Sequence, residues 1–238
     1  MKFSMHHITN RGGRSHNEDC IKCSAGQGIF VLADGLGGHA RGEVASRIAV
    51  ESVFAGCAAA KPTGEALSEI FRAANLEVLA QQEVPGQAEM KTTAVALCFE
   101  ESRAIWAHIG DSRLYHFSGS ALSHVTRDHS VTYRKYLGNE ISYMEIYHDD
   151  DRSSLLRMLG KEGCAPEAGE AEVLPGDGFL LCSDGFWEFV YNEEILADFL
   201  KAETPAQWAQ AMLLRHIART PEGNDNFSLI TIFVEEGT

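Results

Sequence analysis

Residues 92–117, TTAVALCFEESRAIWAHIGDSRLYHF, decide the fold class. Apolar runs occupy 92–99, 104–109 and 114–117, and only a few polar or glycine-bearing residues separate each run from the next. Connections this short cannot contain a crossover helix, so successive strands are expected to pair antiparallel. Similar apolar runs recur elsewhere in the chain, at 3–9, 29–33, 178–182 and 227–234.

Helical patterns arrive in pairs between these runs. The clearest is an i, i+3, i+4, i+7, i+11 stripe of one buried face, made of Leu67, Ile70, Phe71, Ala74 and Val78. Its partner is the segment 42–60, and a second pair covers 193–201 and 205–219. Helix pairs between runs of antiparallel strands favour sheets covered by helices. The sequence therefore predicts an α+β layered fold rather than a doubly wound parallel one.

Composition sets limits on both size and partners. The chain has 238 residues, of which 45% are hydrophobic, enough to fill the core of a single domain, 1–238. Lys and Arg number 20 against 34 Asp and Glu, a net charge of −14. That excess of acid argues against a nucleic-acid partner. It is typical of a soluble surface, and it is also compatible with a few carboxylates gathered around divalent cations.

The same survey predicts the compartment. The first residues contain no apolar signal segment, and runs such as 29–33 and 179–182 are far too short to span a membrane. We expect a soluble, cytoplasmic protein without a membrane partner. Its six cysteines lie mostly in hydrophobic segments, as expected of buried reduced thiols. Cys20 and Cys23 form one CxxC in a strand-like stretch, where we favour a structural role over zinc or redox chemistry.

Carboxylates follow apolar runs at three places. IFVLA leads into Asp34-Gly35, IWAHIG into Asp111, and FLLCS into Asp184-Gly185. A fourth acid, Asp225, directly precedes the last run. Acids at buried strand ends are held rigidly, and clustered carboxylates with one backbone carbonyl are what magnesium or manganese ions prefer. Each acid alone is equally typical of a turn or a helix cap, but the set together favours a shared site.

One cation lies close to an acidic pair near the N-terminus. Arg14 stands four residues before Glu18 and Asp19. Its planar guanidinium is suited to bind a phosphate through two parallel hydrogen bonds. A surface salt bridge from Arg14 to Glu18 is the structural alternative.

Taken in order, these residues resemble a known family. The motifs are Arg14-x-x-x-Glu18-Asp19, Ala33-Asp34-Gly35-Leu-Gly-Gly-His39, Lys91-Thr-Thr93, Gly110-Asp111-Ser-Arg113, Asp128-His-Ser130, Leu156-Arg-Met-Leu-Gly160, Ser183-Asp184-Gly185 and Asp225-Asn226. Their order and spacing over residues 11–234 are similar to those of the metal-dependent protein Ser/Thr phosphatases (PPM, type 2C), in particular the bacterial branch.

The resemblance implies a four-layer α-β-β-α sandwich of two mainly antiparallel sheets, with a metal centre of two manganese or magnesium ions at one end. It implies that Asp34 bridges both metals and that Gly35 lends its carbonyl to one of them. Asp184 and Asp225 would complete the other, and Asp111 would bind a third, looser ion. Glu18 and Asp19 would hold metal-bound waters, and Arg14 would bind the substrate phosphate.

Residues 132–153 occupy the place of the family's flap, which lies beside the cleft and influences substrate choice. The segment 133–151 mixes aromatic and charged residues without a sustained period. This pattern predicts an irregular excursion or short helices on the surface, with a plain loop as the alternative. Its four tyrosines are expected mainly to pack on the sandwich.

The implied chemistry is direct hydrolysis. Two adjacent cations lower the pKa of a bridging water from 15.7 to roughly 7, and the resulting hydroxide attacks phosphorus in line. No cysteine lies in a Cys-x5-Arg arrangement, so a covalent cysteine mechanism is not indicated.

Two positions depart from the family pattern. Some members place a histidine general acid two residues after the bridging Asp, where this chain has Leu36. His39 or a metal-bound water would then protonate the leaving oxygen. Glu188 stands where the family commonly has an Asp that contributes to the third metal. Its longer side chain predicts weaker or water-mediated binding of that ion.

The leading interpretation is a phosphatase acting on phosphoserine and phosphothreonine in proteins, reversing a bacterial Ser/Thr kinase. A related enzyme dedicated to one small regulator is the first alternative. A pseudoenzyme that only binds phosphoproteins is the second. Arg14, Asp34, Asp184 and Asp225 are all intact, which favours an enzyme.

Overall fold

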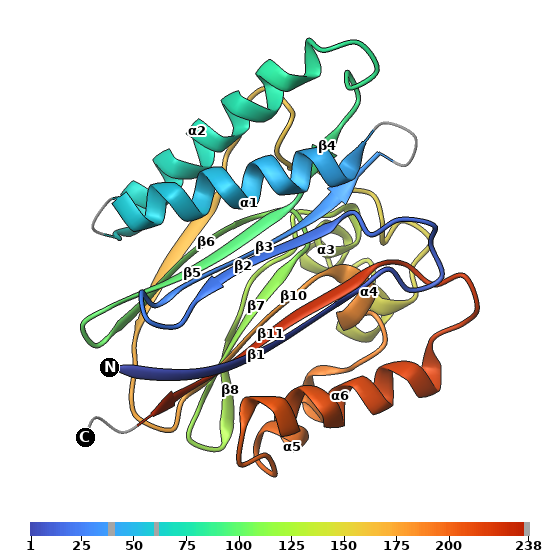
Figure 1. The fold of residues 1–238 in the computed structure, drawn as a ribbon. Coiled ribbons are helices and arrows are strands. Elements are labelled where there is room, and N and C mark those ends of the chain that lie inside the picture. Colours follow the sequence, from blue (N-terminus) through green and yellow to red (C-terminus); the bar gives the residue numbers. More distant parts are fainter. Residues whose placement is uncertain (38–40, 60–61, 236–238) are drawn as a thin grey trace.

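Two β-sheets stacked face to face form the centre of the molecule, and helices cover both outer faces (Figure 1). The structure is a computed structural model that describes residues 1–37, 41–59 and 62–235. The predicted four-layer α+β sandwich is confirmed. Every strand pairing in the described residues is antiparallel, as the short connections predicted.

The first sheet joins the two ends of the chain. Its strands, in spatial order, are β1 (Lys2–Asn10), β11 (Phe227–Glu235), β10 (Gly178–Cys182), β7 (Arg113–Ser118) and β8 (Ala121–Val125). β1 pairs along its full length with β11, from Lys2 opposite Glu235 to Asn10 opposite Phe227. This pairing fixes the start of β11 beside the loop that follows β1.

The second sheet carries the strand that ends in Asp34 and Gly35. Its spatial order is β2 (Asp19–Ser24), β3 (Ile29–Leu36), β5 (Ala94–Glu100), β6 (Arg103–Ile109) and β9 (Glu167–Glu172), with the short β4 (Lys91–Thr92) paired to the end of β3. β3 continues three residues beyond the predicted run 29–33 because β4 pairs with Gly35 and Leu36.

Each outer face is covered by one of the predicted helix pairs. Helices α1 (Gly42–Ala59) and α2 (Gly64–Gln82) pack on the second sheet, and α5 (Asn192–Phe199) and α6 (Pro205–Arg219) pack on the first (Figure 1). The side chain of Thr63 caps α2 by accepting from the amide of Ala66. A one-turn helix, α4 (Asp184–Trp187), follows β10 directly.

The strands read as continuous apolar runs because both of their faces are buried. On β3, Val31 and Ala33 pack with the helices α1 and α2. Phe30 and Leu32 point the other way and pack between the two sheets. The three resulting apolar layers hold the sheet ends rigidly, and the candidate site lies at one of these ends.

The excursion contains short helices, which is one of the predicted possibilities, and it is not a plain loop. These are α3 (Val131–Leu137) and a 3-10 turn, η2 (Tyr143–Tyr147). The segment is not confined to the surface, because Ile146 and Tyr147 are buried in the apolar cluster beside α4 and α5. Tyr147 packs edge-on against Trp187 of α4.

The CxxC pair has no shared chemistry in this fold. Cys20 and Cys23 lie on β2 with side chains packed on opposite faces, one toward α1 and the other between the sheets. All six cysteines are free thiols. The structural reading of Cys20 and Cys23 agrees with this arrangement.

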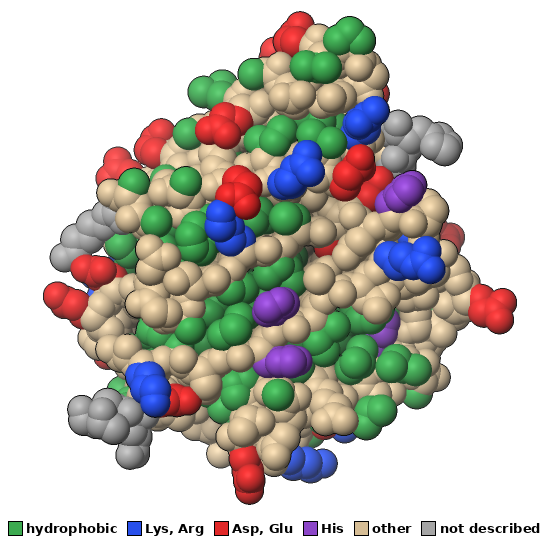
Figure 2. All heavy atoms as spheres, in the orientation of Figure 1, with side chains coloured by type: hydrophobic (Ala, Val, Ile, Leu, Met, Phe, Trp, Pro, Cys, Tyr) green, Lys and Arg blue, Asp and Glu red, His purple; other side chains and the backbone are tan. Residues whose placement is uncertain are grey.

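Surface charge is dispersed on the face viewed in Figure 2, where Lys and Arg side chains stand singly among Asp and Glu. Within the described residues, no helix combines the length and the apolarity needed to cross a bilayer.

Candidate active site

A cleft of about 670 Å³ lies at one end of the sandwich. Its walls come from the loop before β2, the end of β3, and the residues that follow β6, β10 and α6. Ser153, the last residue of the excursion 132–153, and Leu155, just beyond it, complete the lining. Most of the sequence-predicted site residues meet here, namely Arg14, Glu18, Asp34, Gly35, Asp111, Asp184 and Asp225.

Asp34 is held by its backbone at the end of β3. Its amide donates to Thr93 Oγ1 at 3.0 Å, and its carbonyl accepts from Thr92 Oγ1 at 2.7 Å and from the Thr93 amide at 2.9 Å. Both threonines are buried. The Lys91-Thr-Thr93 motif therefore fixes the direction of the Asp34 carboxyl.

Gly35 stands where two other segments approach too closely for any side chain. A Cβ at Gly35 would lie 2.3 Å from the carbonyl oxygen of Gly42 and 2.7 Å from that of Glu18. The Gly35 amide also donates to the Glu18 carbonyl at 3.1 Å. The first turn of α1 and the loop before β2 are thus packed directly on the backbone beside Asp34.

The backbones carrying Asp184 and Asp225 touch in the same way. A Cβ at Gly185 would lie 2.0 Å from the carbonyl oxygen of Asn226 and 3.3 Å from the Cβ of Asp225. Because glycine alone permits this approach, the chain brings two acids that follow β10 and α6 to the same place.

Arg14 reaches this place from the N-terminal loop. Its Nη2 lies 2.8 Å from Asp225 Oδ2, and both side chains are about half exposed at the cleft. The structural alternative from the sequence, a salt bridge to Glu18, is not what the structure has. Arg14 pairs with an acid 211 residues away.

Asn226 was part of a quoted motif but was given no role, and it organises the Arg14 loop. Its Oδ1 accepts from the Glu18 amide at 2.8 Å. Its Nδ2 donates to the carbonyls of Arg11 and His16 at 2.8 and 2.9 Å. Asn226 therefore ties both sides of Arg14 to the start of β11. These partners are more than 200 residues away, so no local pattern could identify them.

The acids of the cleft repel one another. Burial and the charges of Asp19 and Asp184 raise the pKa of Asp34 well above its usual range. Burial and Asp184 do the same to the pKa of Asp111. The Asp34 and Asp184 carboxyls lie within hydrogen-bonding reach of each other. Like charges held this close together favour a cation between them.

Asp19 is the one predicted acid that does not line the cleft. It is buried behind the cleft, where Ser183 Oγ donates to its Oδ2 at 2.8 Å. Its Oδ1 has no hydrogen-bond partner among the described residues. Burial raises the pKa of Asp19 to about 7, helped by Asp184 and Asp225.

Glu188 also lies outside the lining and is engaged by a cation. Arg152, at the end of the excursion, places Nε 3.2 Å from Glu188 Oε1. Burial and the nearby Asp184 raise the pKa of Glu188 to about 7, while Arg152 opposes the rise. The side chain that departs from the family pattern is therefore close to the acids but bound to the excursion.

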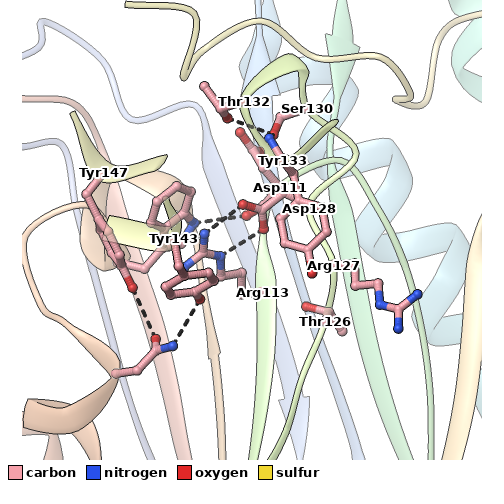
Figure 3. Close-up of polar contacts among 12 residues, drawn as sticks. Asp111, Arg113, Thr126, Arg127, Asp128, Ser130, Thr132, Tyr133, Tyr143 and Tyr147 are labelled. Carbon is pink, nitrogen blue, oxygen red and sulfur yellow. Dashed lines mark hydrogen bonds and ion pairs between the residues drawn. The ribbon is translucent and has the colours of Figure 1, made fainter. Parts of the chain in front are cut away.

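A buried cation supports the wall next to Asp111 (Figure 3). Arg113 donates from Nε and Nη2 to the two carboxylate oxygens of Asp128, at 2.8 and 2.6 Å. Its guanidinium lies 3.5 Å from the ring centroid of Trp187. Trp187 Nε1 in turn donates to the Asp111 carbonyl at 2.9 Å. Arg113 and Asp128 belong to two of the family motifs, and this supporting role is not among those predicted from the sequence.

Two histidines are candidates for the general acid, because Leu36 stands where some family members have a histidine. Leu36 lines the cleft, as its position in the sequence implied. His39 lies outside the described residues. His16, to which the sequence analysis assigned no role, also lines the cleft.

The donor set suits hard divalent cations. Carboxylates dominate the cleft, and Asp19 offers an unpartnered buried oxygen behind it. No three Asp, Glu, His or Cys side chains of the described residues converge tightly enough to chelate a single ion. The acids instead surround an open cleft, an arrangement that fits ions which retain several waters.

The chain belongs to the protein phosphatase 2C family, whose sequence profile matches residues 9–215. It is 33% identical over 221 residues to the serine/threonine protein phosphatase PstP of Mycobacterium tuberculosis, covering 91% of this chain and 42% of that protein. It is 31% identical over 238 residues to the serine/threonine phosphatase stp of Listeria welshimeri, covering 95% of this chain and 90% of that protein. The chain thus spans less than half the length of the mycobacterial relative.

Solved structures share the fold. The crystal structure of the M. tuberculosis phosphatase PstP/Ppp matches with a TM-score of 0.89 and 31% identity, over 99% of this chain and all of that one. The catalytic domain of PstP in complex with two manganese ions matches with a TM-score of 0.86 and 30% identity, over 98% of this chain and 99% of that one.

Proposed function

We propose that this chain is a divalent-metal-dependent protein serine/threonine phosphatase that hydrolyses phosphoserine and phosphothreonine. The observation that carries the proposal is the meeting of Arg14 with Asp34, Asp184 and Asp225 in one cleft. Membership of the protein phosphatase 2C family supports it. So do the serine/threonine phosphatase names of relatives that match nearly the whole chain.

The residues proposed to hold the ions are those that the family resemblance implies. Asp34 and the carbonyl of Gly35 would serve one ion, with Asp34 shared by a second that Asp184 and Asp225 complete. Asp111 would serve a third ion, and Glu18 and Asp19 would orient waters. Manganese is supported by the two ions bound to the related PstP domain, and magnesium has the same preference for oxygen ligands. When bound, such ions activate water and neutralise the charge of the phosphoryl group.

Arg14 is proposed to bind the substrate phosphate. Its guanidinium is half exposed, and only Nη2 is engaged by Asp225. The remaining N–H groups are available to donate to phosphate oxygens. Because the contact is present in both the bound substrate and the transition state, Arg14→Ala should raise KM more than it lowers kcat.

Residues 132–153 are proposed as a flap of a single domain, 1–238. The flap ends next to Ser153 and Leu155 of the cleft, where a phosphoprotein would lie. Its tyrosines interlock edge to face, Tyr133 with Tyr136 and Tyr136 with Tyr143. We propose phosphoproteins of a bacterial Ser/Thr kinase pathway as substrates. We also propose a cytoplasmic location, which the six free thiols support.

The test is hydrolysis of a phosphothreonine peptide and of p-nitrophenyl phosphate by the purified chain. We expect turnover with manganese, none in excess EDTA, and none for Asp34→Asn. Arg14→Ala and Arg11→Ala form a matched pair, because Arg11 is exposed and does not line the cleft. Hydrolysis that persists in EDTA, or an Asp34→Asn enzyme with normal turnover, would refute the proposal.

A further inference from the structure

His216 is a buried imidazole on α6 that reaches toward the acids without entering the cleft. Its Nε2 lies 2.8 Å from the carbonyl oxygen of Gly185. Burial lowers the pKa of His216, which keeps the ring neutral. Because a carbonyl oxygen can only accept, Nε2 carries the proton and donates to Gly185. Nδ1 faces the Thr220 hydroxyl at 3.2 Å.

The Gly185 carbonyl needs this donor because α4 is a single turn. The Glu188 amide donates to Asp184 and the Phe189 amide donates to Phe186. Neither reaches the Gly185 oxygen, so His216 supplies the hydrogen bond that a longer helix would provide from within. The imidazole thereby fixes the peptide that directly follows Asp184.

The same ring contacts the chain segment that carries Asp225. Its centroid lies 4.3 Å from that of Phe227, two residues after Asp225. It also stacks at 5.6 Å and 12° on Phe186, the residue after Gly185. His216 thus contacts the Gly185 carbonyl of one segment and the Phe227 ring of the other, next to the point where Gly185 and Asn226 touch.

We propose that His216 is a positioning residue that sets the separation of the Asp184 and Asp225 carboxylates. It acts by holding the Gly185 peptide and the Phe227 ring from the α6 side. The inference rests on the proposed function, in which these two acids serve the same ion. His216 does not line the cleft and so has no direct contact with a substrate there.

Two substitutions of His216 separate the effect of its hydrogen bond to Gly185 from the effect of its ring packing. His216→Phe keeps an aromatic ring between Phe186 and Phe227 but removes the donor. His216→Gln keeps an amide N–H at a similar reach. His216→Asn is too short to reach Gly185 and replaces the Phe variant if that protein does not fold. His116→Phe is the matched control, because His116 is also buried, stacks on Phe179 and bonds to Asp177, outside the cleft.

The measurement is the Kd for Mn²⁺, obtained from the electron paramagnetic resonance signal of the free ion, with the melting temperature in EDTA recorded in parallel. We expect His216→Phe to raise the Kd at least about threefold, the effect of one lost hydrogen bond, and His216→Gln to stay close to wild type. Excess Mn²⁺ should then restore kcat to His216→Phe. His116→Phe should lower the melting temperature without changing the Kd.

Asp184→Asn distinguishes failure of the inference from failure of the proposed function. If Asp184→Asn abolishes tight Mn²⁺ binding while His216→Phe binds like wild type, the positioning role is wrong and the proposed function stands. If Asp184→Asn binds Mn²⁺ like wild type, the metal site itself is wrong. Equal weakening in His216→Phe and His216→Gln would also overturn the role of the hydrogen bond.

Discussion

At the scale of single residues, glycine decides how closely the acids approach. We predict that Gly185→Ala lowers turnover at least about tenfold, because its Cβ must displace the Asn226 carbonyl 2.0 Å away and so move Asp184 relative to Asp225. Overpacking of this kind costs about 1–3 kcal/mol of unfolding free energy. Kinetics with p-nitrophenyl phosphate measure the turnover, and a urea melt measures the unfolding free energy. Gly26→Ala is the control, since nothing lies within 4 Å of its Cβ position and its φ is not positive; equal effects in the two variants would contradict the argument.

A substitution of Asp34 tests how much the buried carboxylates destabilise the metal-free protein. Burial and the charges of Asp19, Asp184 and Asp111 all raise the pKa of Asp34, so its ionised form is disfavoured in the fold. We predict that Asp34→Asn abolishes activity while leaving the melting temperature in EDTA at pH 8 equal to or above that of wild type. Ser46 is a buried polar residue outside the cleft, and Ser46→Ala should lower the melting temperature. A marked loss of stability in Asp34→Asn would argue that this carboxyl is structural.

Residue types at strand ends were enough to predict which acids meet. Asp34, Asp111 and Asp184 each follow a buried run, and all three line the cleft. Asn226 and His216 were not predicted because their partners are remote in sequence. Their side chains look ordinary until the fold brings Glu18 or Gly185 to them.

At the scale of elements, an ion pair adds to the contacts that hold the end of the excursion beside the cleft. Arg152→Ala should free the segment that leads to Ser153 and Leu155, because Arg152 binds Glu188 from there. We predict amide exchange at least about threefold faster over residues 150–156, with KM for a phosphopeptide raised more than KM for p-nitrophenyl phosphate. Arg152 is the exposed member of the pair and the Glu188 side chain is only 15% exposed, so loss of the pair should cost about 1 kcal/mol of unfolding free energy and lower the melting temperature slightly.

Arg103→Ala provides the comparison, because Arg103 forms an exposed ion pair with Glu170 between β6 and β9, away from the cleft. If Arg103→Ala and Arg152→Ala changed the phosphopeptide KM equally, the anchoring role of Arg152 would be refuted.

Elements with a strong pattern were predicted, and elements formed by pairing alone were not. Seven apolar runs became strands and both helix pairs formed. β8 and β9 lie at sheet edges and are partly exposed, so their sequences carry polar residues without a buried run. β4 has two residues and exists only because it pairs with the end of β3.

At the scale of the whole molecule, the loops that carry the cleft acids meet at one end of the sandwich and concentrate negative charge there. The sequence predicted four layers from paired helices, but it could not predict which strands share a sheet. The order of each sheet depends on contacts such as β1 with β11, which join opposite ends of the chain. That closure places Arg14 beside Asp225.

The concentration of acid predicts how stability depends on pH and metal. Asp19 and Glu188 have pKa values raised to about 7 in the fold, against about 4 in the unfolded chain. Between pH 6.5 and pH 8 the folded state therefore binds protons that the unfolded state has already lost. The unfolding free energy of the metal-free protein should fall by about 1.5 kcal/mol for the two groups together. Below pH 6.5 this fall in stability with rising pH is opposed by histidines whose pKa values burial lowers. They are the buried His108, His129 and His216 and the half-buried His124.

Bound divalent cations should prevent the fall in unfolding free energy between pH 6.5 and pH 8, because a bound ion replaces the protons that the clustered acids hold. We predict that 1 mM Mn²⁺ raises the melting temperature more at pH 8 than at pH 6.5, and that binding releases protons into a weakly buffered solution. Urea melts in EDTA and in Mn²⁺ at the two pH values measure the effect, and Asp19→Asn with Glu188→Gln should flatten the slope in EDTA. A metal-free protein that becomes more stable between pH 6.5 and pH 8 would show that the acids are not mutually destabilising, and the reason for placing cations among them would be lost.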